Sequence, residues 1–502
     1  MTSKPIKKVV IVGRDAPAWL AANALSRALG RTGLDIEVIE LPSLLRSQDA
    51  YRTLPPMEAF HNLLGLDEYA LLKAASGTYS LGQSFVNFAR TRPPFFHPYG
   101  SVGASINQLP FLQFWIKARQ SGMKVELEDF SLTAAAAKQG RFFLPTDDLN
   151  GIARCDYAYH LKALPYVQYL KSHALRQGVT AQGARLADVQ RDGTDGNITR
   201  LILSDGREVT GDLFVDATGA ESLLLGRAMQ VGFESWEKWF PTDRILTASG
   251  ERLKNLPSYS QVRALEYGCL HLAPLQDSTN LQMVYHGDDM KDETTLETVA
   301  TVAGLRLHPD AVVSPHTAGR RSMAWAGNCI AIGEAACVMD AIDNTGLHTT
   351  QLGLAHLISL FPVDGDGELE RREYNAVIQS HFERVRDFQI SHFKLNQIFD
   401  TPYWDYVRGM TVPETLAHKL ATFQARGIVP LYDNEAFQTD SWEAIFVGHG
   451  LMPDAYDPLV DLTPQDVAIP NFQRILGFIK AQVQDMSSHD AFLELYASKH
   501  IA

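Results

Sequence analysis

A glycine-containing hexapeptide, residues 13–18 (G-R-D-A-P-A), follows directly on the apolar run Val9–Val12. It stands where a dinucleotide-binding fold places G-x-G-x-x-G, whose glycines let the backbone approach a pyrophosphate at a helix N-terminus. Glu40 ends the next apolar run, where a carboxylate can bond the ribose of an adenosine. The pattern therefore predicts a dinucleotide site, although only the first of the three glycines is present. The cofactor-binding residues predicted here are Gly13, Ala16, Ala18 and Glu40.

The segments around this hexapeptide have the pattern of a βαβ unit. Val9–Gly13 predicts a buried strand, Ala16–Leu29 a helix and Ile36–Glu40 a second strand. Such a unit implies a parallel sheet, which places the chain in the α/β class. Thr345–Leu360 predicts a further helix. Two more short apolar runs predict additional buried strands: Asp212–Asp216 and Cys329–Gly333.

The sequence pattern changes after about residue 362, where helical periodicity replaces short apolar runs. Three segments show this periodicity: Glu368–Phe399, Val412–Arg426 and Asn471–Met486. Val363–Gly367 contains two Asp-Gly pairs and is the candidate boundary. We therefore expect an α/β module over residues 1–362, with inserted substrate-side β segments, and a mostly helical part over residues 363–502.

Composition and charge exclude several classes of protein. The 502 residues are 45% hydrophobic and 21% charged, which is typical of a globular protein and not of a disordered one. The net charge is −13 and no Lys/Arg-rich run is present, so nucleic acid and an anionic membrane are not expected partners. The four cysteines form no C-x-x-C pair, so we expect no metal site. The absence of an export signal pattern favours a cytoplasmic location, and an oligomer remains possible.

Six segments, together with the hexapeptide, carry a resemblance to a known family. They are Phe95–Gly100, Asp156–His160, Asp212–Gly219, Gly327–Gly333, Asp343–His348 and Tyr456–Pro458. In this order they resemble the flavin-dependent tryptophan halogenase family along almost the whole chain. The resemblance implies a flavin-monooxygenase-like FAD module with a βαβ dinucleotide fold, joined to a mostly helical substrate part.

The resemblance also implies a reaction that runs in two places. Reduced FAD, oxygen and a chloride or bromide ion give hypohalous acid beside the flavin. The acid then passes through a tunnel to a lysine, next to a small aromatic or indole-like substrate, and a glutamate helps to remove the ring proton. A separate flavin reductase is the partner that an active member requires.

Three substrate-side positions depart from the family pattern. Ser80, within Gly77–Gly82, stands at the family's lysine position, and a hydroxyl has no ammonium charge and no amine to form a haloamine. Asp343 takes the glutamate's position and is one methylene shorter. Cys269–Pro274 replaces the W-x-W-x-I-P signature, and within it His271 is a candidate acid or base, with an ordinary pKa near 6.5. A lone histidine in an apolar segment is also typical of a packed core.

The flavin side departs as well. Asp15 takes the place of the second glycine and adds a negative charge where a phosphate should lie. Gln48–Thr53 keeps only its final threonine from the family's second flavin-contacting segment. Thr345 belongs to a pair whose amides can cradle a halide at a helix start, but Asn344 and Thr345 are also good helix caps. The remaining positions that the resemblance assigns to the cofactor side are Gly333, Glu334, Asn344, Thr345 and Gly346.

Three functions are compatible with this pattern. The first is a flavoenzyme with altered chemistry, and the second is a non-catalytic relative, a pseudoenzyme, that binds a ligand or a partner. The third, a dehydrogenase-like protein using a nicotinamide cofactor, ranks last because Asp15 hinders that cofactor equally. We expect a divergent family member that binds FAD weakly or has lost it, and that does not halogenate free tryptophan through a lysine. The non-catalytic binding protein is the alternative.

Overall fold

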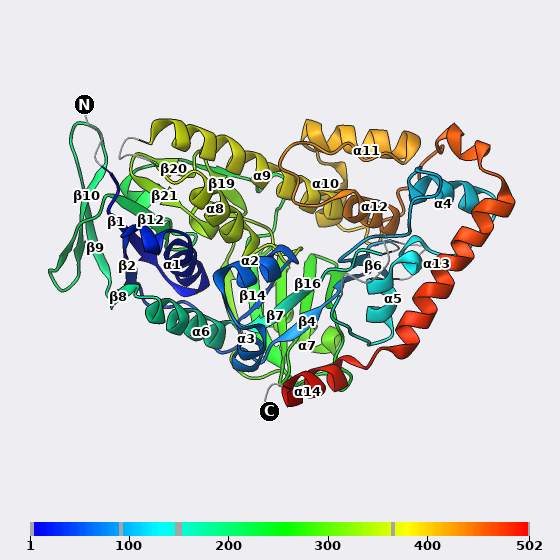
Figure 1. The fold of residues 1–502 in the computed structure, drawn as a ribbon, viewed down its shortest axis with the longest axis horizontal. Coiled ribbons are helices and arrows are strands. Elements are labelled where there is room, and N and C mark those ends of the chain that lie inside the picture. The colour runs from blue at the N-terminus through cyan, green and yellow to red at the C-terminus, as the bar shows by residue number, and fades with distance from the viewer. Residues whose placement is uncertain (1–4, 90–93, 146–152, 363–366, 500–502) are drawn as a thin grey trace. The chain divides into compact units, whose positions relative to one another are not determined.

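The computed structural model describes residues 5–89, 94–145, 153–362 and 367–499 (Figure 1). The chain forms two compact units, each assembled from three separate stretches. Unit 1 comprises Met1–Gly77, Leu161–Phe240 and Thr317–Glu383, and unit 2 comprises Thr78–His160, Pro241–His316 and Arg384–Ala502. The boundary predicted at Val363–Gly367 falls mostly on residues 363–366, which lie outside the described residues, so a division at 362 stays a prediction.

Unit 1 is built on a six-stranded sheet with the order β20-β21-β12-β1-β2-β8. The strands are β1 Lys8–Gly13, β2 Asp35–Glu40, β8 Thr180–Gly183, β12 Leu213–Ala217, β20 Trp325–Ala326 and β21 Cys329–Ala331. β1 pairs in parallel with β2 and β12, so Val9 lies opposite both Ile36 and Leu213. The predicted α/β fold with a parallel sheet is confirmed. The strand predicted over Cys329–Gly333 ends earlier, because Gly333 has a φ of +57° and begins a 3₁₀ helix, Gly333–Ala335.

Helices cover this sheet. α1 (Asp15–Leu29) follows β1 and buries an alanine-rich face, and α6 (Ala163–Arg176) and α8 (His348–Ser359) contact it (Figure 1). The other helices that begin in unit 1 are α2 Pro56–Leu64, α3 Glu68–Ala74, the 3₁₀ turn Gly30–Thr32, the π-helix Leu223–Ala228 and α9 Glu368–Lys394. The smaller strands are β3 Ala50–Arg52, β9 Leu186–Arg191, β10 Ile198–Leu203, β11 Glu208–Val209, β13 Phe233–Ser235, β19 Gly319–Arg321 and β22 Cys337–Val338.

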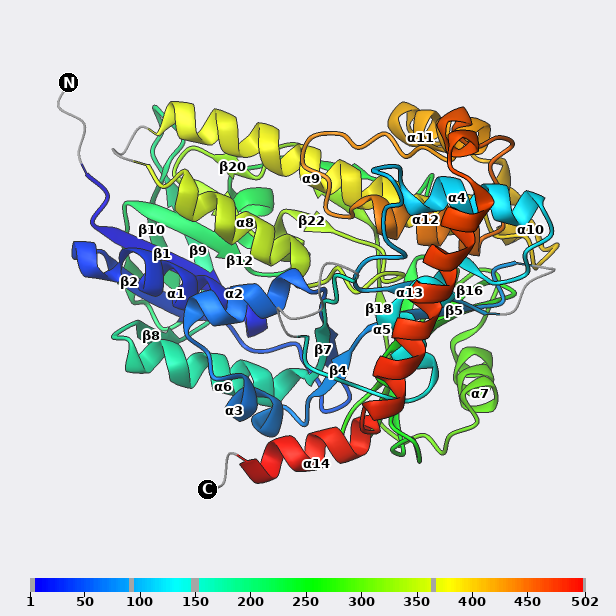
Figure 2. The ribbon, with the colours of Figure 1, turned by 45° about the vertical axis from the view of Figure 1, so that its right-hand side comes forward.

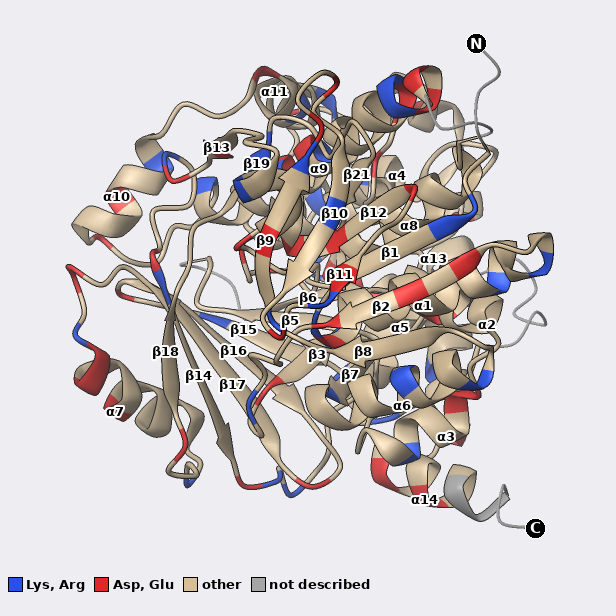
Figure 3. Ribbon diagram, turned by 90° about the vertical axis from the view of Figure 1, so that its left-hand side faces the viewer, with Lys and Arg blue, Asp and Glu red and all other residues tan. Residues whose placement is uncertain are grey.

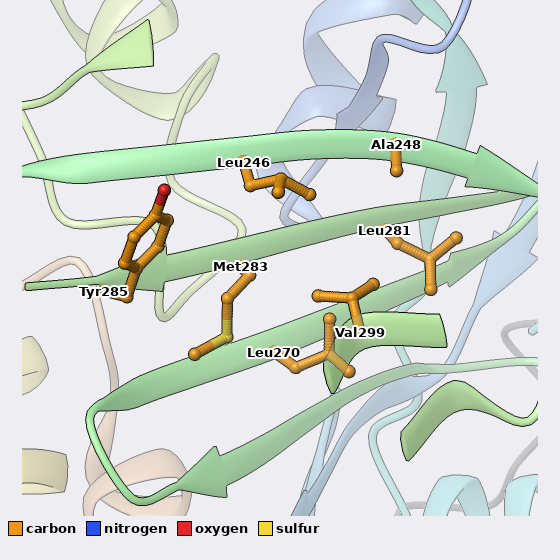
Figure 4. Packing of buried hydrophobic residues seen from close by; sticks show 7 residues of the cluster. All are labelled: Leu246, Ala248, Leu270, Leu281, Met283, Tyr285 and Val299. Atoms are coloured by element: carbon orange, nitrogen blue, oxygen red, sulfur yellow. The ribbon is translucent and has the colours of Figure 1, made fainter. Parts of the chain in front are cut away.

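Unit 2 is built on a seven-stranded sheet with the order β18-β14-β17-β16-β15-β5-β6. Its strands are β5 Gly82–Val86, β6 Phe95–Pro98, β14 Arg244–Gly250, β15 Ser260–Leu265, β16 Gly268–Pro274, β17 Thr279–Tyr285 and β18 Val312–Pro315. One face packs against α7 (Asp292–Ala303), where Val299 meets Leu246, Leu270, Leu281 and Met283 (Figure 4). Two further short strands, β4 Thr78–Ser80 and β7 Ala158–Lys162, form an antiparallel pair outside this sheet.

The C-terminal part of unit 2 is helical, as predicted. Its helices are α10 Pro402–Gly409, α11 Glu414–Arg426, α12 Thr439–Gly448, the 3₁₀ turn Pro458–Leu462, α13 Gln465–Asp485 and α14 His489–Lys499. α13 contacts α5 (Leu132–Lys138), and Figure 2 shows the two side by side. The remaining helices are α4 Phe111–Gln120 and the 3₁₀ turn Leu127–Phe130. Among the residues described, no helix has the length and apolar character needed to cross a membrane.

Candidate functional site

The glycine of the hexapeptide allows two strands to approach closely. β1 ends at Gly13, where an added Cβ would lie 2.5 Å from the carbonyl oxygen of Ala217 at the end of β12. The amide of Arg14 donates to the same oxygen, at 3.2 Å. Gly13 is therefore required by the packing of the sheet, whatever ligand lies above it. Ala18, at the third glycine position, is fully buried in α1.

Asp15 keeps the backbone conformation of the glycine that it replaces. Its φ is +61°, in the left-handed region that favours glycine, where another L-residue pays roughly 1–2 kcal/mol. Aspartate is one of the residues that tolerate this region, because its short carboxylate can bond locally. Here the carboxylate accepts a hydrogen bond from the Ser43 hydroxyl at 2.5 Å, which ties the segment after β2 to the start of α1.

A tyrosine hydroxyl occupies the first turn of α1. The amide of Ala16 donates to the hydroxyl oxygen of Tyr51 at 3.4 Å. Amides at a helix N-terminus are the groups that would otherwise bind a phosphate. Burial raises the pKa of the Tyr51 hydroxyl well above its usual value, so this group is a neutral phenol. Sequence reasoning identified Gln48–Thr53 as altered but assigned no role to Tyr51, because only the fold brings β3 to the start of α1.

Glu40 ends β2 as predicted, but its carboxylate is already engaged. Lys171 of α6 pairs with one oxygen at 2.6 Å, and the indole nitrogen of Trp19 donates to the other at 3.3 Å. A ribose hydroxyl at this position would therefore share the carboxylate with two protein donors.

Carboxylates gather around the start of α1. Loss of hydration raises the pKa of Asp15, and the charge of Glu40 raises it further. Loss of hydration also raises the pKa values of Asp49 and Glu334, and Asp15 contributes to both. Arg14 is adjacent to Asp15 in the chain, but its guanidinium pairs with Glu221 at 3.1 Å. Acidic residues also mark β2 in Figure 3.

The segment assigned to the halide lies in unit 1 and is buried. Asp343, Asn344 and Thr345 are each no more than 2% exposed. The amide of Thr345 donates to the carbonyl of Asp343 at 2.8 Å, so this amide is not directed at an ion. The prediction that Asn344 and Thr345 cap a helix is wrong, and so is the prediction that the helix starts at Thr345. The carbonyl of Thr345 accepts from the amide of His348 in a turn, and α8 begins only at His348, without a side-chain cap.

The turn before that segment requires a glycine. Gly333 has a φ of +57°, and a Cβ added there would meet the Thr350 hydroxyl at 2.6 Å. Glu334 follows it in the 3₁₀ helix. Gly346 has open space where a Cβ would stand, so packing does not require a glycine there.

Ser80 and His271 both lie inside unit 2. Ser80 is the last residue of β4, opposite Ala158, and is fully buried. Its hydroxyl donates to the carbonyl oxygen of Gly82 at 3.0 Å. His271 is 1% exposed in the middle of β16, between Val262 and Gln282 of the neighbouring strands. Asp343, in contrast, belongs to unit 1.

Metal-binding groups and cysteine thiols are the other candidates for chemistry in the described part of the chain. No group of three or more His, Cys, Asp or Glu side chains there is arranged to hold a metal ion. All four cysteines are buried free thiols: Cys155, Cys269, Cys329 and Cys337.

Comparison with known proteins decides the family. The tryptophan halogenase family matches residues 8–465. This chain belongs to the tryptophan halogenase family. The family resemblance found in the sequence is therefore confirmed.

Relatives of the tryptophan halogenase family match along almost their whole lengths. Tryptophan 6-halogenase ThaL of Streptomyces albogriseolus is 27% identical over 92% of this chain and 93% of the relative. Tryptophan 7-halogenase RebH of Lentzea aerocolonigenes is 23% identical over 96% of this chain and 97% of the relative. Among solved structures, the flavin-dependent halogenase BrvH from Brevundimonas sp. BAL3 is 32% identical, with a TM-score of 0.93 and coverage of 98% of this chain and 99% of that one.

Membership of a flavin-dependent halogenase family implies FAD, but the residues at the start of α1 do not fit its pyrophosphate. The amide of Ala16 is taken by Tyr51, and Asp15 places a carboxylate beside it. Two unit charges about 4 Å apart repel by roughly 1 kcal/mol in water and by several where water is scarce. A halogenase-type cofactor would have to displace Tyr51 and approach Asp15.

Proposed function

We propose that this member of the halogenase family does not halogenate free tryptophan by the lysine-dependent reaction. The observation that carries the proposal is Ser80, at the position where the family resemblance implies the lysine. Its hydroxyl is buried and donates to the carbonyl of Gly82. A hydroxyl held in this way supplies neither an ammonium charge to orient hypohalous acid nor an amine to carry the halogen.

We further propose that the chain binds FAD more weakly than flavin-dependent halogenases do. Three residues support this. Tyr51 occupies an amide that would meet the pyrophosphate, and Asp15 adds a negative charge beside it. Glu40, which would meet the ribose, already pairs with Lys171. If the protein turns over, its substrate is a small aromatic or indole-like compound, a flavin reductase supplies reduced flavin, and chloride or bromide is the halide. Asp343 then takes the role of the glutamate, and His271 is a candidate acid or base.

A second candidate is a non-catalytic protein that keeps the halogenase fold to bind a ligand or a partner. It is favoured by the start of α1, where Tyr51 accepts from an amide that would otherwise face a cofactor phosphate and Ser43 bonds the Asp15 carboxylate. The flavin content of the purified protein discriminates between the two candidates, because a flavoenzyme should retain flavin absorbance.

The test combines FAD titration with mass spectrometry of reactions that contain a flavin reductase, chloride or bromide, and either tryptophan or a panel of indoles. We expect no monohalogenated tryptophan beyond a control of reduced flavin without the protein. Monohalogenated tryptophan formed over many turnovers would contradict the first proposal. Turnover of another indole would reject the non-catalytic candidate while leaving the proposal about tryptophan intact.

A further inference from the structure

An open pocket of about 540 Å³ lies at the carboxyl ends of β2 and β8, entirely within unit 1. This edge of a parallel sheet is where α/β folds place their ligands. The volume falls in the range of small-molecule sites. Leu41, after β2, and Leu164 and Val167, from α6, give the pocket an apolar wall.

The charges of the pocket are not those of a phosphate site. Asp15, Glu40 and Asp205 line it together. Glu40 is compensated by Lys171 at 2.6 Å, and Asp205 by Arg207 at 2.5 Å. The only arginine of the lining, Arg185, has an exposed side chain, and a charge in water is largely screened.

Asp15 differs from the other two carboxylates of the lining. No lysine or arginine among the described residues forms an ion pair with it, and its hydrogen bonds come from neutral donors, the Ser43 hydroxyl and the backbone of Leu44. The guanidinium of Arg14 is held by Glu221. Asp15 therefore presents an uncompensated negative charge, partly shielded from water, next to an apolar wall.

We propose that this pocket binds an organic cation, an amine or amidine carried on an apolar body, with its charged group at Asp15. The carboxylate accepts the N–H donors of the cation, and Leu41, Leu164 and Val167 cover the apolar body. The same carboxylate repels a phosphate, so the pocket selects for the opposite charge to that of a dinucleotide. The inference does not depend on the proposed loss of tryptophan halogenation.

Two probes with one ring system and opposite charge test the proposal. Calorimetric titration of the full chain with 2-(1-naphthyl)ethylamine should show saturable binding, and 1-naphthylacetate should bind at least about tenfold more weakly. Asp15→Asn should weaken binding of the amine by about tenfold, because it removes the charge but keeps an acceptor for Ser43 and tolerates a positive φ. Arg185→Gln should leave binding of the amine nearly unchanged, because water screens the charge of this exposed side chain.

Asp35→Asn is the matched control, since it makes the same charge change at an exposed residue of β2 that does not line the pocket. It should leave binding of the amine unchanged. Absence of amine binding, equal binding of the two probes, or equal effects of the two aspartate variants would overturn the inference. Unchanged circular dichroism and melting of Asp15→Asn show that any lost binding comes from the pocket. None of these results bears on halogenation, which is measured separately.

Discussion

The amide of Ala16, in the first turn of α1, donates a hydrogen bond to the hydroxyl of Tyr51, a side chain of the protein itself. In a dinucleotide fold this turn presents unsatisfied amides to the phosphates. Here Tyr51 accepts from one of these amides, that of Ala16, and the Asp15 carboxylate fastens the turn to Ser43. At least one donor at the start of α1 is thus occupied by the protein itself, and this leads directly to a prediction about the cofactor.

Asp15→Gly should tighten the binding of FAD by about 1–2 kcal/mol, because it removes one like charge and restores the residue that the positive φ favours. Titration followed by flavin fluorescence measures the change. Asp35→Asn, which removes an exposed charge on the same unit, should have no effect. A wild-type protein that purifies with a full complement of flavin would contradict the expectation.

Ser80→Lys should restore little or no halogenation and should lower the free energy of unfolding by about 2–4 kcal/mol, because it buries a charge where Ser80 is fully enclosed. Ser80→Ala should cost only about 1 kcal/mol, the worth of the bond to Gly82. Ser121→Lys makes the same substitution at an exposed position and should be neutral. Urea unfolding and mass spectrometry provide the two measurements. Robust halogenation by Ser80→Lys would show that the flavin side is intact.

The free energy of unfolding should fall as the pH drops from about 6.5 towards 4, because several histidines are buried in the neutral form. Burial lowers the pKa values of His61 and His392 to about 3 and the pKa of His489 to about 4. His61 also shares a hydrogen bond with the Tyr166 hydroxyl. The unfolded chain takes up protons near pH 6.5 and the folded chain does not. Each such histidine therefore removes up to about 1.4 kcal/mol per pH unit below that pH.

Melting temperature measured against pH checks this expectation. His61→Phe should flatten the acid limb of the curve, whereas His308→Gln, at an exposed histidine, should leave it unchanged. Equal slopes for the wild type and His61→Phe would count against the assignment.

Asp216→Ala should destabilise the protein by about 2–4 kcal/mol, since it removes the acceptor for several buried donors at once. Its carboxylate accepts from the amides of Leu224 and Leu225 at 2.9 and 2.8 Å and from the Thr218 hydroxyl at 2.6 Å. Asp188→Ala, at an exposed residue of β9, should stay within about 0.5 kcal/mol of the wild type. Chemical denaturation compares the three proteins, and equal midpoints would refute the role given to Asp216.

The fold could be predicted where local pattern and tertiary structure agree. Two segments show this agreement: the β-branched run that becomes β1 and the alanine-rich segment that becomes α1. Each has the residue pattern of its element, and each buries its apolar residues in the core. The start of α8 could not be predicted in this way, because Asn344 and Thr345 are good caps and are instead used in a turn that ends at His348. Helix propensity gives no information about which hydrogen bond a loop will prefer.

The candidate site could be predicted only as a set of positions. The altered residues Asp15 and Ser80 are visible in the sequence, but the partners that define them are not. Tyr51 approaches Ala16 across 35 residues of chain, and Lys171 approaches Glu40 across 131. Such contacts depend on the order of strands and helices in unit 1, and no local spacing encodes them.

The interleaving of the two units has a consequence for synthesis of the protein. The sheet of unit 1 needs β1 from the first residues made and β21 from Cys329–Ala331, and unit 2 needs Thr78–His160 together with the C-terminal helices. Neither unit can close its core while most of the chain is still on the ribosome, since its last stretch emerges late. A fragment that ends before Cys329 lacks β21, and a fragment that begins after Gly13 lacks β1, so either cut leaves the sheet of unit 1 incomplete. Nascent chains should therefore depend on chaperones until translation ends.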